Sequence, residues 1–400
     1  MPKIPPALQK KASKIFLFAF LWGIVPLLSV EILMIVLEPY LFKGFFQYDP
    51  DIGFRVRAHT NGSNQFGFND KDYPLEKPSG ITRILVLGDS FGWVGGLGEN
   101  YTTLMDGHFT RKWGENKVEV INAGYPMTHT GEQLKILEKY GLQYQPDIVV
   151  LGFFVGNDFF DADPKRKRIV VNDIYFDIKK NEELKILGYP IIPQWRLLLL
   201  IQQKYKVFQE QMKAAKSVSA NPLMPAAIAA TPVPTPPPST PDAYYPPGVA
   251  EETYLNVESQ MLSFYNRNLH AEDEFKKEIN FVFESIDAMA ELLESKTIKF
   301  IVAIYPAAFQ VDENLAKKLF EYNDLNRDDY DLLLAQKILK EYLDKKGIPY
   351  IDLLDEFKVE QKTQPLYIKN DTHWNRAGNQ LAAEILFKNL VPVVEKEAGL

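Results

Sequence analysis

Apolar residues along most of the chain alternate between short continuous runs and segments with a helical period. Short apolar runs bounded by turn residues are typical of strands buried on both faces, and gaps of three and four predict amphipathic helices. The alternation predicts an α/β fold with a parallel sheet between helices. The predicted strands are Ile84–Leu87, Val118–Ile121, Ile148–Phe154, Lys299–Ile304 and Tyr350–Leu353, and the clearest helices carry Phe275–Leu293, Leu334–Tyr342 and Leu381–Leu390.

A longer apolar run lies near the amino terminus, at residues 15–37, and its one charged residue is Glu31. A helix of this length crosses a hydrocarbon core of about 30 Å, so we predict a transmembrane helix there, with a buried core helix as the alternative. Glu31 would lie near the far interface or pair with a partner in the membrane. Lysines in residues 1–14 place that end in the cytoplasm and the remaining chain on the extracytoplasmic side of the cell (inner) membrane. These lysines are Lys3, Lys10, Lys11 and Lys14.

Two regions lack the alternation of strands and helices. Residues 38–82 begin with aromatic residues suited to a membrane interface or a docking surface. They continue as a lead-in rich in Gly, Asn, Asp and Pro, with one short hairpin. Residues 160–257 are predicted to be an insertion, in which a proline-rich linker at 221–248 is extended or disordered. The basic run Lys165–Arg168 is expected in a solvated loop or against an anionic lipid or glycan. The short apolar run Trp195–Ile201 is expected in a core or lid helix.

The composition narrows the function. With 46% hydrophobic residues in 400, the chain is able to bury a sizeable core. A net charge of -7 argues against nonspecific binding of nucleic acid, which requires a basic surface. The absence of cysteine excludes disulfides, thiolate metal sites and cysteine nucleophiles. The five histidines include no His-Glu-x-x-His pattern, so a zinc protease is not indicated.

Residues suited to acyl transfer follow four of the predicted strands. Ser90 ends the first strand in Gly-Asp-Ser, and a serine nucleophile requires a base. His373 follows the last strand, with Asp371 two residues before it. In an extended segment these two side chains point the same way, so Asp371 would orient the imidazole and leave its other nitrogen for Ser90. The Gly124 N–H and the Asn157 amide, after the second and third strands, are candidate donors to an oxyanion.

Each of these motifs taken alone is more often a turn or a helix cap. Because the carboxyl ends of parallel strands meet at one edge of a sheet, their occurrence together favours one site. The four blocks resemble those of the SGNH (GDSL) hydrolase superfamily, over roughly Arg83 to Leu390. The resemblance implies a flavodoxin-like, five-stranded parallel sheet sandwiched by helices. Its two halves would be residues 83–159 and 258–400, on either side of the insertion.

The resemblance also implies roles for individual residues. Ser90 would be the nucleophile, His373 its base and Asp371 the group that orients the base. The Ser90 N–H, the Gly124 N–H and Asn157 would form the oxyanion hole, and no metal or organic cofactor is implied. Two tryptophans next to the motifs, Trp93 and Trp374, are expected to bind substrate.

The chain departs from the superfamily at the acid. The usual position, three residues before the histidine, is Asn370 here. Asp371 at minus two is similar to the Asp-x-His-Trp block of alginate O-acetyltransferase-like members, which suggests extracytoplasmic glycan O-acyl chemistry. Gly88–Gly92 also fits the Gly-x-Ser-x-Gly elbow of α/β-hydrolases. That fold requires several strands before its nucleophile, and one irregular segment separates the predicted membrane span from Arg83.

Three functions remain open at this point. The first is a membrane-anchored serine esterase acting on O-acyl groups, in particular O-acetyl groups, of a glycan or lipid. The second is an O-acetyltransferase that modifies a cell-envelope polysaccharide with the same residues. The third is a non-catalytic assembly or binding subunit on a retained hydrolase fold. The sequence does not separate the first two, because they differ in how well the acyl-enzyme is shielded from water.

Overall fold

The chain divides into two compact units in the computed structural model. One unit comprises Met1–Phe54 and Lys167–Pro234, and the other comprises Arg55–Arg166 and Thr235–Leu400. Most of the proline-rich linker and of Trp195–Ile201, and the first half of the basic run, lie outside the described residues. The described residues are 14–15, 17–18, 20–41, 44–162, 167–171, 174–178, 185–186, 189–190, 197, 201, 205, 208, 245, 247–268 and 273–399.

The first unit contains the amino-terminal helix and short strands. A π-helical turn, η1 (Phe20–Ile24), leads into helix α2 (Val25–Leu41). Glu31 on α2 is buried, and its Oε2 accepts the Leu197 N–H at 2.9 Å. The described strands form two-stranded sheets: β1 (Phe46–Asp49) with β2 (Gly53–Val56), β6 (Lys167–Val171) antiparallel to β7 (Ile174–Ile178), and β8 (Lys185–Ile186) antiparallel to β9 (Tyr189–Pro190).

The amino-terminal helix differs from the prediction. The apolar run is split between the π-helical turn and α2, and α2 itself has 17 residues, from Val25 to Leu41. None of the helices in the described part of the chain combines the length and the apolar character that a membrane crossing needs. The transmembrane helix predicted at residues 15–37 is therefore not confirmed.

The second unit is built on the predicted parallel sheet. Its five strands lie in the order β11-β10-β5-β3-β4, and every neighbouring pair is parallel. All residues of β3 and β5 are buried, as continuous apolar runs require when helices cover both faces. The predicted strands are thus confirmed with small shifts at their ends. The strands are β3 (Thr82–Gly88), β4 (Val118–Gly124), β5 (Ile148–Phe154), β10 (Lys299–Tyr305) and β11 (Tyr350–Asp352).

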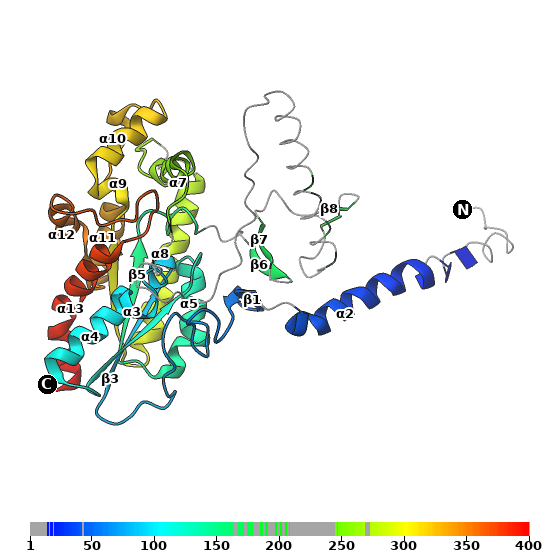
Figure 1. The fold of residues 1–400 in the computed structure, drawn as a ribbon, viewed down its shortest axis with the longest axis horizontal. Helices are drawn as coiled ribbons and strands as arrows, with labels where there is room; N and C mark the ends of the chain where they lie inside the picture. Colours follow the sequence, from blue (N-terminus) through cyan, green and yellow to red (C-terminus); the bar gives the residue numbers. More distant parts are fainter. Residues whose placement is uncertain are drawn as a thin grey trace. The chain divides into compact units, whose positions relative to one another are not determined.

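Helices cover both faces of this sheet. Figure 1 shows α4 and α13 on one side of the sheet and α5 and α8 on the other. The three predicted helices are present as α8, α11 and α13. The long helices are α4 (Tyr101–Trp113), α5 (Thr130–Lys139), α7 (Glu251–Ser263), α8 (Asp273–Glu294), α10 (Glu313–Tyr322), α11 (Leu334–Lys346) and α13 (Arg376–Ala398). The short ones are η2 (Ser90–Gly92), α3 (Gly96–Glu99), η3 (Gly141–Tyr144), α9 (Ala308–Val311), η7 (Arg327–Asp329) and α12 (Leu354–Glu360).

The start of α7 falls inside the region predicted as an insertion. Its residues Tyr254, Leu255 and Leu262 are buried in the second unit. Polar residues interrupt the apolar positions of this helix, which weakens the period that would reveal it in the sequence. The α/β unit therefore resumes before residue 258.

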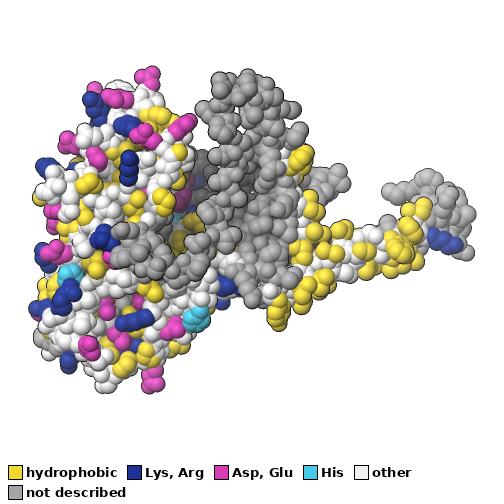
Figure 2. Space-filling model, in the orientation of Figure 1, with side chains coloured by type: hydrophobic (Ala, Val, Ile, Leu, Met, Phe, Trp, Pro, Cys, Tyr) yellow, Lys and Arg dark blue, Asp and Glu magenta, His cyan; other side chains and the backbone are white. Residues whose placement is uncertain are grey.

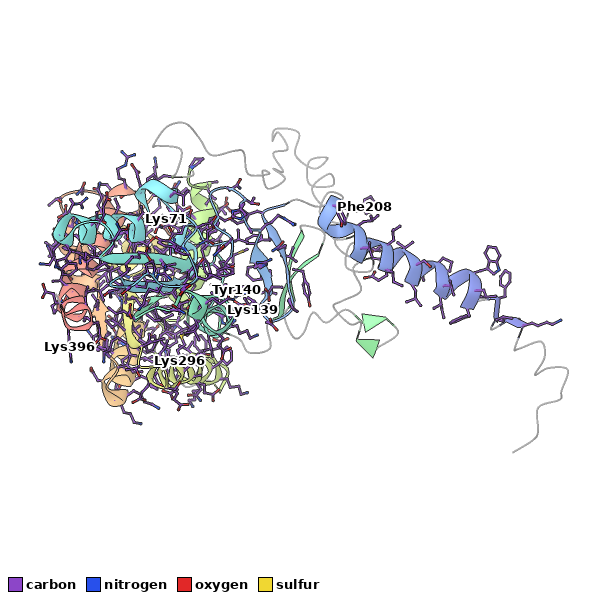
Figure 3. All side chains as sticks on the ribbon, turned by 90° about the horizontal axis from the view of Figure 1, so that it is seen from below. Lys71, Lys139, Tyr140, Phe208, Lys296 and Lys396 are labelled. Atoms are coloured by element: carbon purple, nitrogen blue, oxygen red, sulfur yellow. The ribbon has the colours of Figure 1, made fainter. Side chains whose placement is uncertain are left out.

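An aromatic cluster ties the lead-in segment to the sheet unit. The Phe66 ring lies 5.3 Å from the rings of Tyr140 and of Tyr144. Figure 3 labels Tyr140 beside Lys139 at the end of α5, and the Lys139 Nζ lies 5.5 Å from the Tyr140 ring. This packing places the residues that follow, Asn69 and Asp70, next to strand β4.

Candidate active site

The predicted motifs lie at the carboxyl edge of the sheet. Gly88, the last residue of β3, pairs in register with Gly124, the last residue of β4. Ser90 begins the 3-10 turn η2 directly after β3. The preceding Asp89 is buried, and its Oδ1 accepts the Phe91 N–H at 3.1 Å. This capping bond fixes the turn that carries the serine.

Residues 367–374 form the tight loop that carries the histidine and the acid. An antiparallel bridge joins the first and last residues of the loop. Inside it, the Ile368 N–H donates to the His373 carbonyl at 2.9 Å, and the Asp371 N–H donates to the Ile368 carbonyl at 3.1 Å. Asn370 has a φ of 55°, a left-handed conformation that asparagine tolerates better than most residues. The loop therefore ends with His373 and Asp371 held in one rigid turn.

The structure brings Ser90, His373 and Asp371 into one hydrogen-bonded series. Ser90 Oγ lies 2.7 Å from His373 Nε2, and His373 Nδ1 lies 2.6 Å from Asp371 Oδ1. The same Asp371 oxygen accepts the backbone N–H of His373 at 2.8 Å. Asp371 thus reaches the imidazole through an Asx turn, and not through the extended spacing that we expected. This arrangement favours the tautomer with the proton on Nδ1, which leaves Nε2 as the acceptor for Ser90.

The pKa values of two aspartates at this site, Asp371 and Asp89, are shifted in opposite directions. Burial acts to raise the pKa of Asp371, but the hydrogen bonds and charge of His373 outweigh it, so this pKa lies below its ordinary value. Burial raises the pKa of Asp89 to about 6, although the bond from the Phe91 N–H and the charge of His373 act against it. Asp371 is therefore the aspartate that His373 holds in its charged carboxylate form.

The three expected oxyanion donors differ in their availability. Within the described part of the chain, the Ser90 N–H makes no hydrogen bond. Asn157 Nδ2 donates to Asp161 Oδ2 at 3.3 Å, which leaves its second N–H for a ligand. The Gly124 N–H, by contrast, donates to Asn122 Oδ1 at 3.0 Å. The expectation of a ligand-facing Gly124 N–H is corrected here, because the side chain two residues earlier folds back and occupies it.

The two tryptophans have different surroundings from those predicted. Trp374 is fully buried in an aromatic cluster, with its ring 4.6 Å from that of Phe91 and 4.9 Å from that of Tyr305. A substrate-binding role for Trp374 is therefore wrong, because apolar packing removes the ring from the surface. Trp93 is half-buried, and its indole N–H donates to the Gly124 carbonyl at 3.0 Å. Contact of Trp93 with substrate stays a prediction.

A buried acid that the sequence analysis did not single out interacts electrostatically with Asp371. Glu258 on α7 has 0% exposure, and neither carboxyl oxygen has a hydrogen-bond partner among the described residues. Burial raises its pKa to about 8, and the charge of Asp371 adds to the rise. Glu258 is therefore a neutral acid next to Asp371 at pH 7. No motif in the sequence marks it, because its position depends on how α7 packs.

A separate cavity of about 700 Å³ lies beside α9 and α10. This volume is typical of small-molecule sites. Its lining includes Arg267, Phe309, Phe320, Arg327 and Lys358, and none of Ser90, Asp371 and His373. The cavity is thus separate from the hydrogen-bonded series.

A family model matches the part of the chain that carries His373 and Asp371. It covers residues 264–398 and is described as the SGNH hydrolase-like domain of the acetyltransferase AlgX. Residues 264–398 are therefore similar to an SGNH hydrolase-like domain. The resemblance to the SGNH superfamily is confirmed, and so is the predicted class of an SGNH-type ester hydrolase or O-acyltransferase.

Solved structures similar to this SGNH-like chain include two ester hydrolases. The acetyl xylan esterase AlAXEase has 16% identity and a TM-score of 0.37, over 77% of this chain and 99% of its own. A lipase/acylhydrolase from Enterococcus faecalis has 14% identity and a TM-score of 0.34, over 78% of this chain and 97% of its own. No curated protein matches the chain.

Proposed function

We propose that the chain is a serine esterase of the SGNH type that cleaves O-acyl groups, in particular O-acetyl groups, from a glycan or a lipid. The observation that supports this most directly is the hydrogen-bonded series from Ser90 through His373 to Asp371, with distances of 2.7 and 2.6 Å. A nucleophile, a base and an anion that orients the base are the groups that acyl transfer requires. A non-catalytic subunit would have no need to keep these contacts.

In the proposed reaction each of these groups has a role. As Ser90 Oγ attacks the ester carbonyl carbon, His373 Nε2 takes the serine proton, and Asp371 stabilises the imidazolium. The negative charge on the carbonyl oxygen faces the Ser90 N–H and the Asn157 amide. Collapse of this intermediate returns the proton to the leaving alcohol and leaves the acyl group on Oγ. A water molecule then attacks with His373 as base, and the carboxylic acid is released.

An esterase assay on the full chain tests this function. Wild type is expected to release acid from an aryl acetate, and Ser90→Ala is expected to abolish that release. Ser295→Ala is the matched control, because Ser295 is an exposed serine at the end of α8. Equal rates for wild type and Ser90→Ala would contradict the proposal.

O-acetyl transfer to a glycan is the second candidate function. The match of residues 264–398 to an acetyltransferase domain favours it. In that case a sugar hydroxyl replaces water in the second step, and His373 takes the proton of that hydroxyl. Supplying an acetyl donor with candidate polysaccharides and weighing the products by mass spectrometry separates the two. Acetylated glycan supports the transferase, and acetate alone supports the esterase.

We further propose that the chain works at a membrane, held by its amino-terminal apolar segment, with the SGNH-like domain on the extracytoplasmic side. Apolar side chains on α2 such as Ile32, Leu33 and Val36 are more than half exposed. Figure 2 shows hydrophobic side chains covering much of the visible face of this helix. Exposed apolar surface of this extent favours contact with lipid or a partner. The lysines before it favour a cytoplasmic amino terminus.

A further inference from the structure

Asn122, near the end of β4, connects three segments of the chain beside Ser90. Its side chain is buried, with 1% exposure. Its Nδ2 donates to the carbonyls of Gly92 (2.6 Å) and Asn69 (3.0 Å), and its Oδ1 accepts the Gly124 N–H (3.0 Å). Both amide protons and the carbonyl oxygen of this side chain are therefore in use, which fixes its orientation.

The two glycines that Asn122 joins must approach each other closely. A Cβ on Gly92 would lie 2.8 Å from Asn122 Oδ1 and 3.1 Å from the Gly124 Cα. A Cβ on Gly124 would lie 3.0 Å from the Asp89 carbonyl oxygen. The serine turn and the end of β4 thus pack backbone against backbone, with the Asn122 amide between them.

Side chains form hydrogen bonds to both the N–H and the carbonyl of Gly124. Asn122 binds the Gly124 N–H, and the Trp93 indole N–H donates to the Gly124 carbonyl at 3.0 Å. The Asn122 backbone is held in turn, because its N–H donates to Asp70 Oδ2 at 2.8 Å. The lead-in segment therefore reaches the nucleophile turn through a continuous set of hydrogen bonds.

We propose that Asn122 is a positioning residue for acyl transfer at Ser90, which it serves by setting the spacing between the serine turn and the end of β4. The inference rests on the proposed function. Asn122 itself does not contact the acyl group and acts through Gly92 and Gly124. Transition-state donors are effective only when they are held in place before the reaction, and a shift of about 0.5 Å is enough to weaken them.

Two variants of the full chain test this role. Asn122→Ala removes all three side-chain bonds. Asn122→Asp keeps the shape and the acceptor for the Gly124 N–H, but an ionised carboxylate cannot donate to the Gly92 and Asn69 carbonyls. Both variants are expected to lower kcat on an aryl acetate by about tenfold to a hundredfold, with KM within about threefold of wild type. The rate of Ser90 labelling by a fluorophosphonate should fall in parallel, because that adduct also places an oxygen in the oxyanion site.

Asn64→Ala is the matched control for loss of a buried amide. Asn64 has 1% exposure; its Nδ2 donates to the Lys71 carbonyl and its Oδ1 accepts the N–H groups of Phe66 and Phe68. Asn64 makes no hydrogen bond to the serine turn. The Asn64→Ala variant should therefore be less stable than wild type but have the same kcat. The inference is overturned if Asn122→Asp keeps kcat and labelling rate within about twofold of wild type, or if Asn64→Ala lowers them as much as Asn122→Ala. A wild type without esterase activity would count against the proposed function alone, and the labelling rates would then decide the role of Asn122.

Discussion

A single oxygen of Asp371 accepts both the ring Nδ1–H and the backbone N–H of His373. The Asx turn sets the backbone and the imidazole at the same time, which explains how an acid at minus two replaces one at minus three. Burial opposes the charge on Asp371, and the bonds from His373 outweigh that effect, so its pKa is lowered. A neutral side chain of the same shape would lack the negative charge that the imidazolium needs.

Asp371→Asn should therefore lower kcat by about 10²- to 10⁴-fold with a small change in KM. An amide that keeps the backbone bond can present its NH₂ to Nδ1, which favours the wrong tautomer. Steady-state kinetics on an aryl acetate measures the effect, with Asp355→Asn, an exposed aspartate on α12, as the control. An unchanged kcat in Asp371→Asn would show that another group orients His373.

Glu258 affects stability in a way that depends on pH. Its pKa of about 8 in the folded chain lies above the ordinary glutamate value of 4.5, because burial disfavours its charged form. Below about pH 4.5, Glu258 is protonated in both the folded and the unfolded chain, so it does not change the free energy of unfolding. Between that pH and 8 the unfolded chain releases the proton and the folded chain keeps it, so stability falls as pH rises.

Glu258→Gln should remove this pH-dependent loss of stability. The difference in unfolding free energy between the variant and wild type is expected to grow from pH 5 to pH 8, by an amount on the order of 3 kcal/mol. Urea denaturation at several pH values measures it. Glu252→Gln is the control, since Glu252 is exposed on the same helix. A difference that stays constant over this pH range would mean that Glu258 ionises normally in the folded chain.

At the scale of elements, the loop that carries Asp371 and His373 packs against the residues just before α7. The Val249 N–H donates to the Asn370 carbonyl at 3.2 Å, and Asn370 Nδ2 donates to the Val249 carbonyl at 3.3 Å. A Cβ on Gly248 would lie 1.8 Å from the Lys369 carbonyl oxygen. The position of Asp371 therefore depends on a glycine that is distant in sequence.

Gly248→Ala should push this loop away and lower kcat by about tenfold, with a loss of about 1 to 3 kcal/mol in stability. Steady-state kinetics measures kcat, and urea denaturation of the same preparation measures the free energy of unfolding. Gly98→Ala is the control, because a Cβ there meets nothing within 4 Å. If Gly248→Ala retains full kcat, the loop adjusts without moving Asp371.

At the scale of the whole molecule, the amino-terminal segment sets the proposed location. Ile32 and Leu33 on α2 are 61% and 54% exposed. We expect the full chain to sediment with membranes and to stay there after an alkaline carbonate wash. The double variant Ile32→Lys/Leu33→Lys should weaken this association, because each lysine costs about 2.5 to 3.5 kcal/mol in a bilayer centre. Val359→Lys, at an exposed valine of the other unit, is the control, and release of wild type by the wash would contradict a membrane anchor.

Much of the sheet unit was predictable because its strands are buried on both faces. Ile148–Phe154 is apolar from end to end and was predicted with the bounds observed for β5. Helix α7 was hidden in the predicted insertion, since Tyr254 and Glu258 break the apolar pattern of its buried side. Trp374 was misassigned because the sequence does not show whether a large aromatic side chain beside such a motif packs into the core or faces a substrate.

The sequence by itself determined the order of the strands along the chain and the residue types at their carboxyl ends, because burial and turn formation act on neighbouring residues. Ser90, His373 and Asp371 could be named from those patterns alone. Only the tertiary structure decided which hydrogen bonds these groups make. The Gly124 N–H is occupied by Asn122, and a buried, neutral Glu258 interacts with the charge of Asp371. Both depend on packing between segments that are distant in the chain, which no local pattern encodes.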